Sequence, residues 1–220
     1  MHIEIPASRQ IDPTIDGISL ERKTRFAGYI IDYIENNLPR YAAGSTENKP
    51  SLFEYAREKG PDREMKFTLI ERFNEKPSRF PNQNFNSQFD LGIACDLLLD
   101  LLRYEDNEIL NPVLVYQDYK QTAKNNQLYC EKDLYKRIKN NFFVLIVKEI
   151  FKLIVKAKEY KQFKSCSTVG QNLANALIRE DQSAMERELA KVMRNVIAVM
   201  TGSVDESMGL SSQRSSTMLN

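Results

Sequence analysis

Apolar residues recur at helical spacing through most of this 220-residue chain. In the segment 87–104, for example, Leu91, Ala94 and Leu98 follow one another at intervals of three or four residues. Residues spaced in this way lie on one face of an α-helix. The same spacing dominates residues 19–200, and no segment shows the clean apolar–polar alternation of a strand over five residues. The sequence therefore predicts an all-α fold.

The helical pattern divides the chain into a single domain of seven to nine helices with two irregular ends. We expect this domain at residues 19–201, an extended arm at 1–18, where proline and glycine recur, and a disordered tail at 202–220, where no apolar period exists. The clearest helices are expected at residues 19–37, 62–75, 87–104, 112–124, 131–159, 167–178 and 183–200.

For two of these helices, the sequence also predicts whether they lie in the core or face solvent. The helix at 131–159 is the longest and is apolar nearly all round near its start, so we expect it at the centre of the domain. The helix at 87–104 is expected to carry Asp90, Asp96 and Asp100 on a solvent-exposed face.

The composition excludes several classes of protein. Cys95, Cys130 and Cys166 are far apart, which fits free thiols in the cytoplasm better than a disulfide framework or a zinc site. His2 is the only histidine, so catalytic triads and histidine-ligated metals are not expected, and neither is a cofactor. A net charge of +1 does not indicate a nucleic-acid binder. The longest apolar run, 142–147, is far shorter than the ~20 residues of a membrane span.

One segment contains the end of a predicted helix, a loop and the start of the next helix. Residues 101–119 read LLRYEDNEILNPVLVYQDY, with Arg103 at the end of the first helix. Pro112 suits the first turn of the next helix, and Tyr116 and Tyr119 follow at helical spacing. By itself this pattern predicts two core helices joined by a loop.

Two further motifs accompany that stretch. Residues 166–179 read CSTVGQNLANALIR and place Asn172 directly before an apolar pair, and an earlier loop contains Leu52, Phe53 and Glu54 in succession. Taken in order, the three motifs resemble the GTPase-activating domain of Rho-family regulators, the RhoGAP domain. The resemblance spans most of the predicted helical domain and implies a RhoGAP-like helical bundle.

The resemblance implies a particular role for the early loop. In the family, an arginine directly after the apolar–Phe pair enters the active site of the bound GTPase, whereas here that position is Glu54. Arg57 lies three residues further on and takes the catalytic role only if the loop is rebuilt. The family's lysine one turn before Arg103 falls on Leu99 and is therefore also missing. In the missing arginine and in the spacing of Pro112, Tyr116 and Tyr119, the chain is most similar to the catalytically inactive domain of oculocerebrorenal-type inositol 5-phosphatases, which lacks the same arginine.

The function implied is binding of a Rho-family small GTPase through Phe53, Glu54, Arg103 and Asn172, with weak or no activation. Glu54→Arg is then expected to raise GTP hydrolysis. Each residue also has a simpler interpretation. Glu54 and Arg57 fit a solvated loop, Asn172 fits a solvent-facing helix position, and Arg103 fits a helix-end arginine that pairs with a nearby aspartate. A helical scaffold that binds a short peptide or protein is the alternative function, and an enzyme of unrecognised type is a third.

A basic stripe is the last feature of note. Lys148, Lys152 and Lys156 are spaced i, i+4 and i+8, within a segment, 132–164, that holds ten basic and three acidic side chains. Such a stripe fits an acidic protein or an anionic membrane surface, which would make the chain membrane-peripheral. The alternative is the solvated face of an amphipathic helix.

Overall fold

Helices make up the regular structure of the chain in the computed structural model, which describes residues 20–43, 51–54, 66, 68–71, 90–103, 108–162 and 165–203. Within these residues there is no strand, only an isolated bridge between Leu110 and Ile138. The predicted all-α fold class is confirmed. The predicted arm at 1–18 and almost all of the predicted tail lie outside the described residues.

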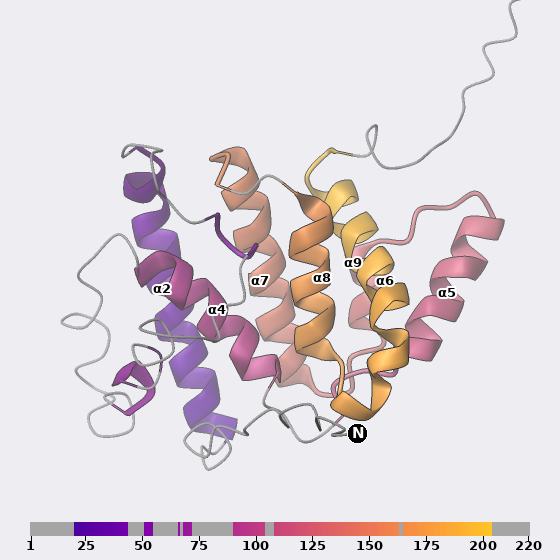
Figure 1. The fold of residues 1–220 in the computed structure, drawn as a ribbon, viewed down its shortest axis with the longest axis horizontal. Helices are drawn as coiled ribbons and strands as arrows, with labels where there is room; N and C mark the ends of the chain where they lie inside the picture. The colour runs from indigo at the N-terminus through magenta and orange to yellow at the C-terminus, as the bar shows by residue number, and fades with distance from the viewer. Residues whose placement is uncertain are drawn as a thin grey trace, which may run out of the picture.

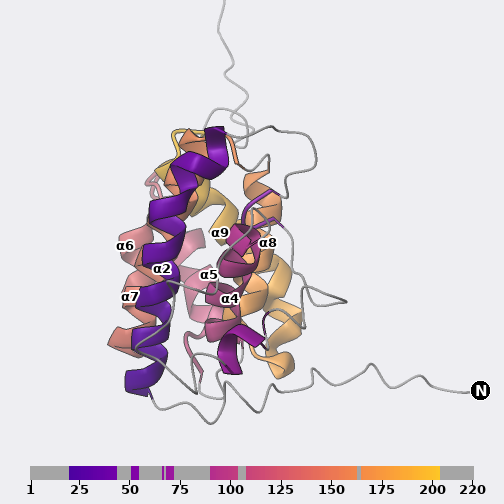
Figure 2. The same cartoon turned by 90° about the vertical axis from the view of Figure 1, so that its left-hand side faces the viewer.

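Figure 1 shows how the helices follow one another. They are α2 (Leu20–Ala43), α4 (Asp90–Arg103), α5 (Pro112–Lys124), α6 (Glu131–Tyr135), α7 (Asn141–Glu159), α8 (Cys166–Leu177), the 3₁₀ helix η2 (Glu180–Met185) and α9 (Glu186–Met200). In Figure 2, α2, α6 and α7 lie on one side of the molecule and α8 and α9 on the other. Helix α5 packs against α9 at the end of the bundle remote from α2.

Helix α4 is the central helix of the bundle. It packs against α2, α7 and α8, and every residue from Leu91 to Leu102 is buried. The expectation of an exposed acidic face was therefore wrong for Asp96 and Asp100, which are each only 2% exposed, and the side chain of Asp90 lies outside the described part of the chain. The spacing of apolar residues did not reveal this burial. In a helix that other elements cover on all sides, the polar side chains are buried as well and need polar partners within the protein.

The predicted helix at 131–159 is in fact two helices, α6 and α7. The chain leaves the helix between them because Ile138 forms an antiparallel bridge with Leu110 and the Lys139 N–H donates to the Ile109 carbonyl at 2.9 Å. Asn140 then caps α7 by accepting a hydrogen bond from the Phe142 N–H at 2.8 Å. Long-range backbone pairing thus overrides the local helical pattern.

Helix α2 continues to Ala43 rather than ending near residue 37. It runs through Pro39, and Leu38 and Tyr41 on either side of that proline are only 1% and 5% exposed. Burial of these two side chains favours continuation of the helix over the break that proline usually causes. Among the described residues, no helix is both long and apolar enough to span a bilayer.

Helices α8 and α9 approach each other closely at Gly170. A Cβ atom at this position would lie 2.7 Å from the Arg194 backbone nitrogen. Only glycine fits such a contact without displacing one helix from the other. The contact fixes α8, which carries Asn172, against the rest of the domain.

Candidate functional site

The turn at residues 51–54 docks onto the junction between α7 and α8. The Leu52 N–H donates to the Gln162 carbonyl at 2.8 Å, and Asn172 Nδ2 donates to the Phe53 carbonyl at 2.9 Å. The Ser165 N–H donates to Glu54 Oε1 at 2.5 Å. Three successive residues of the turn are thereby held by Gln162 and Ser165, which lie between α7 and α8, and by Asn172 in the middle of α8.

The turn at residues 51–54 is also held by the packing of its side chains into the hydrophobic core. Leu52 is fully buried and Phe53 is 4% exposed, and both belong to the hydrophobic core. Phe53 has a backbone φ of +62°, in the left-handed region that a phenylalanine rarely adopts. A strained backbone persists where the surrounding contacts outweigh its cost. The turn is therefore shaped by the surface on which it lies.

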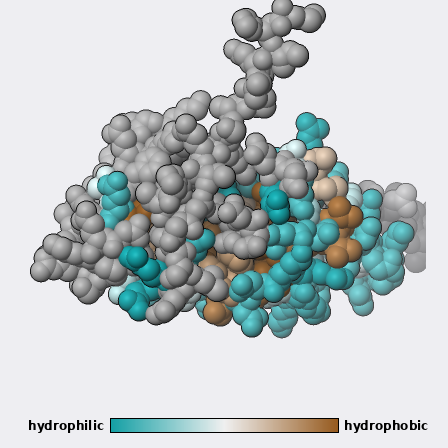
Figure 3. Space-filling view, turned by 90° about the horizontal axis from the view of Figure 1, so that it is seen from below, coloured by the Kyte–Doolittle hydropathy of each residue, from teal (hydrophilic) through white to brown (hydrophobic). Residues whose placement is uncertain are grey.

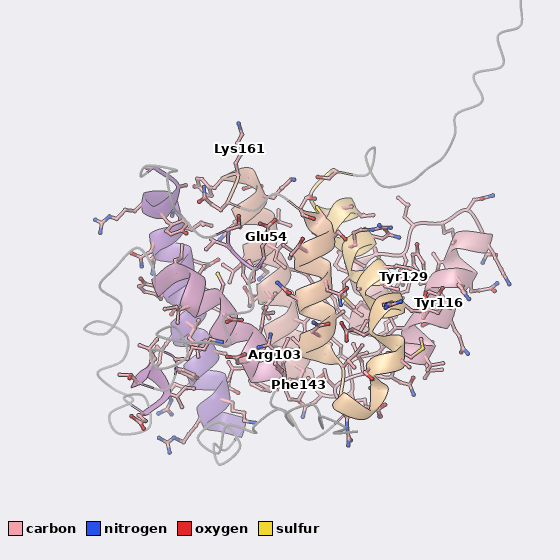
Figure 4. All side chains as sticks on the ribbon, in the orientation of Figure 1. Glu54, Arg103, Tyr116, Tyr129, Phe143 and Lys161 are labelled. Carbon is pink, nitrogen blue, oxygen red and sulfur yellow. The ribbon has the colours of Figure 1, made fainter. Side chains whose placement is uncertain are left out.

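The Glu54 side chain points into the protein. It is 8% exposed, and its carboxylate accepts from the N–H of Ser165, the residue that caps α8. A helix N-terminus carries unpaired N–H groups and partial positive charge, so a carboxylate there stabilises the helix. Figure 4 shows Glu54 beside the upper part of α7 and α8. At this position Glu54 ties the turn to α8.

The structure brings together three of the residues that the sequence singled out. Phe53, Glu54 and Asn172 meet at one place although the turn and α8 are more than 100 residues apart in sequence. The contacts described above are internal, so these side chains shape the local surface rather than project from it. Arg57 lies outside the described residues.

Arg103 lies elsewhere, at the end of α4 and well below Glu54 in Figure 4. Its side chain is 3% exposed and pairs with Asp100. Lys66 bridges the same carboxylate at 2.8 Å and that of Asp96 at 2.6 Å. Two cations and two carboxylates thus form a buried cluster, which matches the helix-end pairing that the sequence had left open for Arg103.

The electrostatics of this cluster favour a charged Lys66. Burial by itself would lower the pKa of the lysine, but the attraction of Asp100 and Asp96 and their hydrogen bonds outweigh it, so the pKa is raised. A buried ion pair with mutual hydrogen bonds costs most when one partner is removed. The cluster therefore fastens the helical segment around Lys66 to α4.

Each lysine of the basic stripe has a neighbour within the protein. Lys148 Nζ lies 5.3 Å from the centre of the Tyr135 ring, Lys152 pairs with Glu149, and Lys156 pairs with Glu35 on α2. These contacts are exposed and are weak enough to be exchanged for other partners. The carboxylates nevertheless offset much of the positive charge that the spacing of the lysines suggested.

Sequence reasoning missed the residues that hold the turn, Gln162 and Ser165. Ser165 carries a local signal, because its hydroxyl accepts from the Thr168 N–H as an N-cap, and serine before a helix is a recognised start signal. Gln162 acts through its backbone carbonyl, so its side chain gives no signal. Lys66 was also missed, since only the fold places it beside α4.

The tyrosines that follow Pro112 pack α5 onto α9. Asn195 Nδ2 donates to the Tyr119 hydroxyl, and the Tyr119 ring meets the Tyr129 ring edge-on at 6.0 Å. Burial raises the pKa of Tyr129, so this phenol stays protonated throughout the physiological range.

Val113 and Leu114 at the start of α5 are each 43% exposed. In the coloured part of Figure 3, small areas of apolar side chains lie among hydrophilic ones.

No cluster of three or more potential metal ligands exists among the described residues. Comparisons of the chain with protein-family models, with curated proteins and with solved structures found no match.

Proposed function

We propose that this chain is a RhoGAP-like module that binds a Rho-family small GTPase without activating it. The observation that carries the proposal is the contact between the Leu52–Glu54 turn and Asn172. Two of the three motifs behind the resemblance are distant in sequence, yet they adjoin in the fold. Such adjacency is what a shared partner-binding surface requires.

The absence of activation follows from the chemistry at position 54. An arginine inserted in trans neutralises negative charge on the transferred phosphoryl group and is worth about 10³–10⁵ in rate. A carboxylate repels that charge, and the Glu54 carboxylate is in any case bound to the Ser165 N–H. The module would therefore act by occupying or localising the GTPase.

The proposed contact surface lies on the outer side of the turn and of α8. Ser167 and Thr168 are exposed on the first turn of α8, close to Ser165 and Glu54. Phe53, Glu54 and Asn172 support this surface from beneath. Arg103 contributes indirectly, because its pairing with Asp100 fixes the end of α4.

The test is direct binding to a panel of Rho, Rac and Cdc-type GTPases in both nucleotide states, with single-turnover hydrolysis measured alongside. We expect binding to at least one GTPase and hydrolysis at the intrinsic rate. Ser167→Arg should weaken binding at least tenfold, whereas Lys152→Glu on α7 is the matched control and should not. Binding to no GTPase in either state would overturn the proposal.

The second candidate is a helical scaffold that binds a short peptide or protein partner without any GTPase. One observation favours it specifically, namely that Gln162, Ser165 and Asn172 already hold a turn of the chain itself through hydrogen bonds. Peptide binding by such a scaffold can be tested without any GTPase.

A further inference from the structure

Asp118 on α5 is held by an arginine from the link between α6 and α7. Arg137 Nε donates to Asp118 Oδ2 at 2.5 Å, and Arg137 Nη2 donates to Asp118 Oδ1 at 2.9 Å. The side chains of Arg137 and Asp118 are 41% and 33% exposed. Exposed ion pairs contribute little net stability, because water solvates both partners when they separate. The pair can therefore open at little cost.

The hydroxyl of Tyr129 is a second donor in the neighbourhood of this carboxylate. Tyr129 is 4% exposed, and its ring meets the ring of Tyr119, the residue after Asp118, edge-on at 6.0 Å. Burial is the main cause of the raised pKa of Tyr129, and the negative charge of Asp118 is the next largest cause. The phenol is therefore protonated, buried and within the electrostatic field of Asp118.

The Tyr129 hydroxyl has no hydrogen-bond partner among the residues that the structure describes. A buried donor without a partner costs free energy, so nearly all buried polar groups in proteins are hydrogen-bonded. If the Asp118 carboxylate turned inward from Arg137, it would accept a charge-assisted hydrogen bond from the phenol at a position shielded from water. The carboxylate thus has one partner at the surface and an alternative partner in the interior.

We propose that Asp118 exchanges between the guanidinium of Arg137 and the hydroxyl of Tyr129. In the first arrangement, which the structure shows, the carboxylate neutralises the charge of Arg137. In the second arrangement, the phenol donates to the carboxylate, and the guanidinium is left to solvent on the link between α6 and α7. The three residues therefore form a two-state device that withholds or presents one cation at this surface. This inference goes beyond the proposed function and does not depend on it.

The test is a double-mutant cycle on the full chain, with the Tm as the readout. Tyr129→Phe deletes only the hydroxyl, so in the wild type it should leave the Tm unchanged or raise it. In the Arg137→Ala variant, Asp118 has lost its surface partner and accepts from Tyr129 instead. In that variant, Tyr129→Phe should lower the Tm by about 2–4 °C. Equal shifts in the two backgrounds would overturn the proposal and show that the hydroxyl is satisfied in another way.

Two further variants identify the carboxylate that moves. Adding Asp118→Ala to the Arg137→Ala variant should abolish the effect of Tyr129→Phe, because the acceptor is gone. Lys136→Ala is the matched control, since it removes the neighbouring ion pair with Asp133, whose charge also acts on Tyr129. In this control, Tyr129→Phe should behave as in the wild type. If Tyr129→Phe were destabilising in the Lys136→Ala variant alone, the exchange would belong to Asp133 and the proposal for Asp118 would be overturned. No GTPase enters this experiment, so its result is separate from the proposed function.

Discussion

Asn172 Nδ2 donates a hydrogen bond to the carbonyl oxygen of Phe53, 119 residues earlier in the chain, at 2.9 Å. This bond joins the strained turn at residues 51–54 to α8. It makes Asn172 part of the internal structure of the domain, whereas the sequence had left open a solvent-facing role.

Asn172→Ala tests the contribution of this bond to stability. The substitution removes the amide donor and leaves the carbonyl oxygen of the buried Phe53 without its hydrogen bond. We therefore expect the free energy of unfolding to fall by about 1–3 kcal/mol. Urea unfolding followed by circular dichroism measures the change. Ser167→Ala, on the exposed side of α8, is the control and should change stability by less than about 0.5 kcal/mol. Equal effects of the two substitutions would show that the bond is weak.

Glu54→Arg is now expected to behave differently from the expectation based on sequence alone. The substitution places a guanidinium beside the Ser165 N–H, so two donors face each other where a carboxylate accepted before. We therefore expect a lower Tm and no increase in GTP hydrolysis. Glu54→Gln keeps an acceptor oxygen and should lose less stability than Glu54→Arg. Faster hydrolysis with an unchanged Tm would show that position 54 can turn outward and act as the family's arginine does.

Gly170→Ala and Gly28→Ala form a matched pair within helices. Alanine at 170 would place a Cβ 2.7 Å from the Arg194 backbone nitrogen, whereas nothing lies within 4 Å of a Cβ at 28. We expect Gly170→Ala to destabilise the protein and Gly28→Ala to stabilise it by about 0.5–1 kcal/mol through helix propensity. Thermal unfolding of the two variants measures both. A stabilising Gly170→Ala would show that α8 and α9 can separate at no cost.

Lys66→Met tests the buried charge cluster. Removing the lysine takes a positive charge away from the buried carboxylates of Asp96 and Asp100, so we expect a loss of about 3–5 kcal/mol at neutral pH. Because folding raises the pKa of Lys66, its contribution is fully present below its unfolded-state value of 10.5 and is lost as the pH rises through the folded-state value. On the alkaline side, the difference between wild type and variant should therefore persist up to about pH 9 and shrink above about pH 10.5. A difference that shrank below pH 9 would contradict this assignment.

The basic stripe is expected to behave mainly as a solvated face. Lys152 and Lys156 already pair with Glu149 and Glu35, and exposed pairs contribute at most about 1 kcal/mol each. Reversing Lys148, Lys152 and Lys156 together to glutamate should lower stability slightly. Binding to vesicles that contain anionic lipid is the functional assay. We expect neither the wild type nor the triple variant to bind them at 150 mM salt. Salt-sensitive binding by the wild type alone would instead establish the membrane-peripheral role.

The sequence by itself determined the fold class and most of the helices. Helix α5 matches its expected bounds, and α4 and α8 differ from theirs by a few residues at most. These segments are specified locally, through apolar spacing and terminal signals such as Asn111, whose side chain accepts from the N–H groups of Val113 and Leu114. Local patterns of this kind need no knowledge of the rest of the chain.

Only the tertiary structure decided what the polar residues do. The periodicity of α4 could not indicate that Asp96 and Asp100 pair with buried cations instead of facing water, because Lys66 comes from a distant part of the chain. The break before α7 likewise depends on a bridge between Ile138 and Leu110. At the candidate site, the motif identified Glu54 as the residue in place of an arginine, but its binding to the Ser165 N–H depends on a contact spanning 111 residues. Periodicity records which face of a helix avoids water, whereas the partner of a buried polar group is set by the packing of the whole chain.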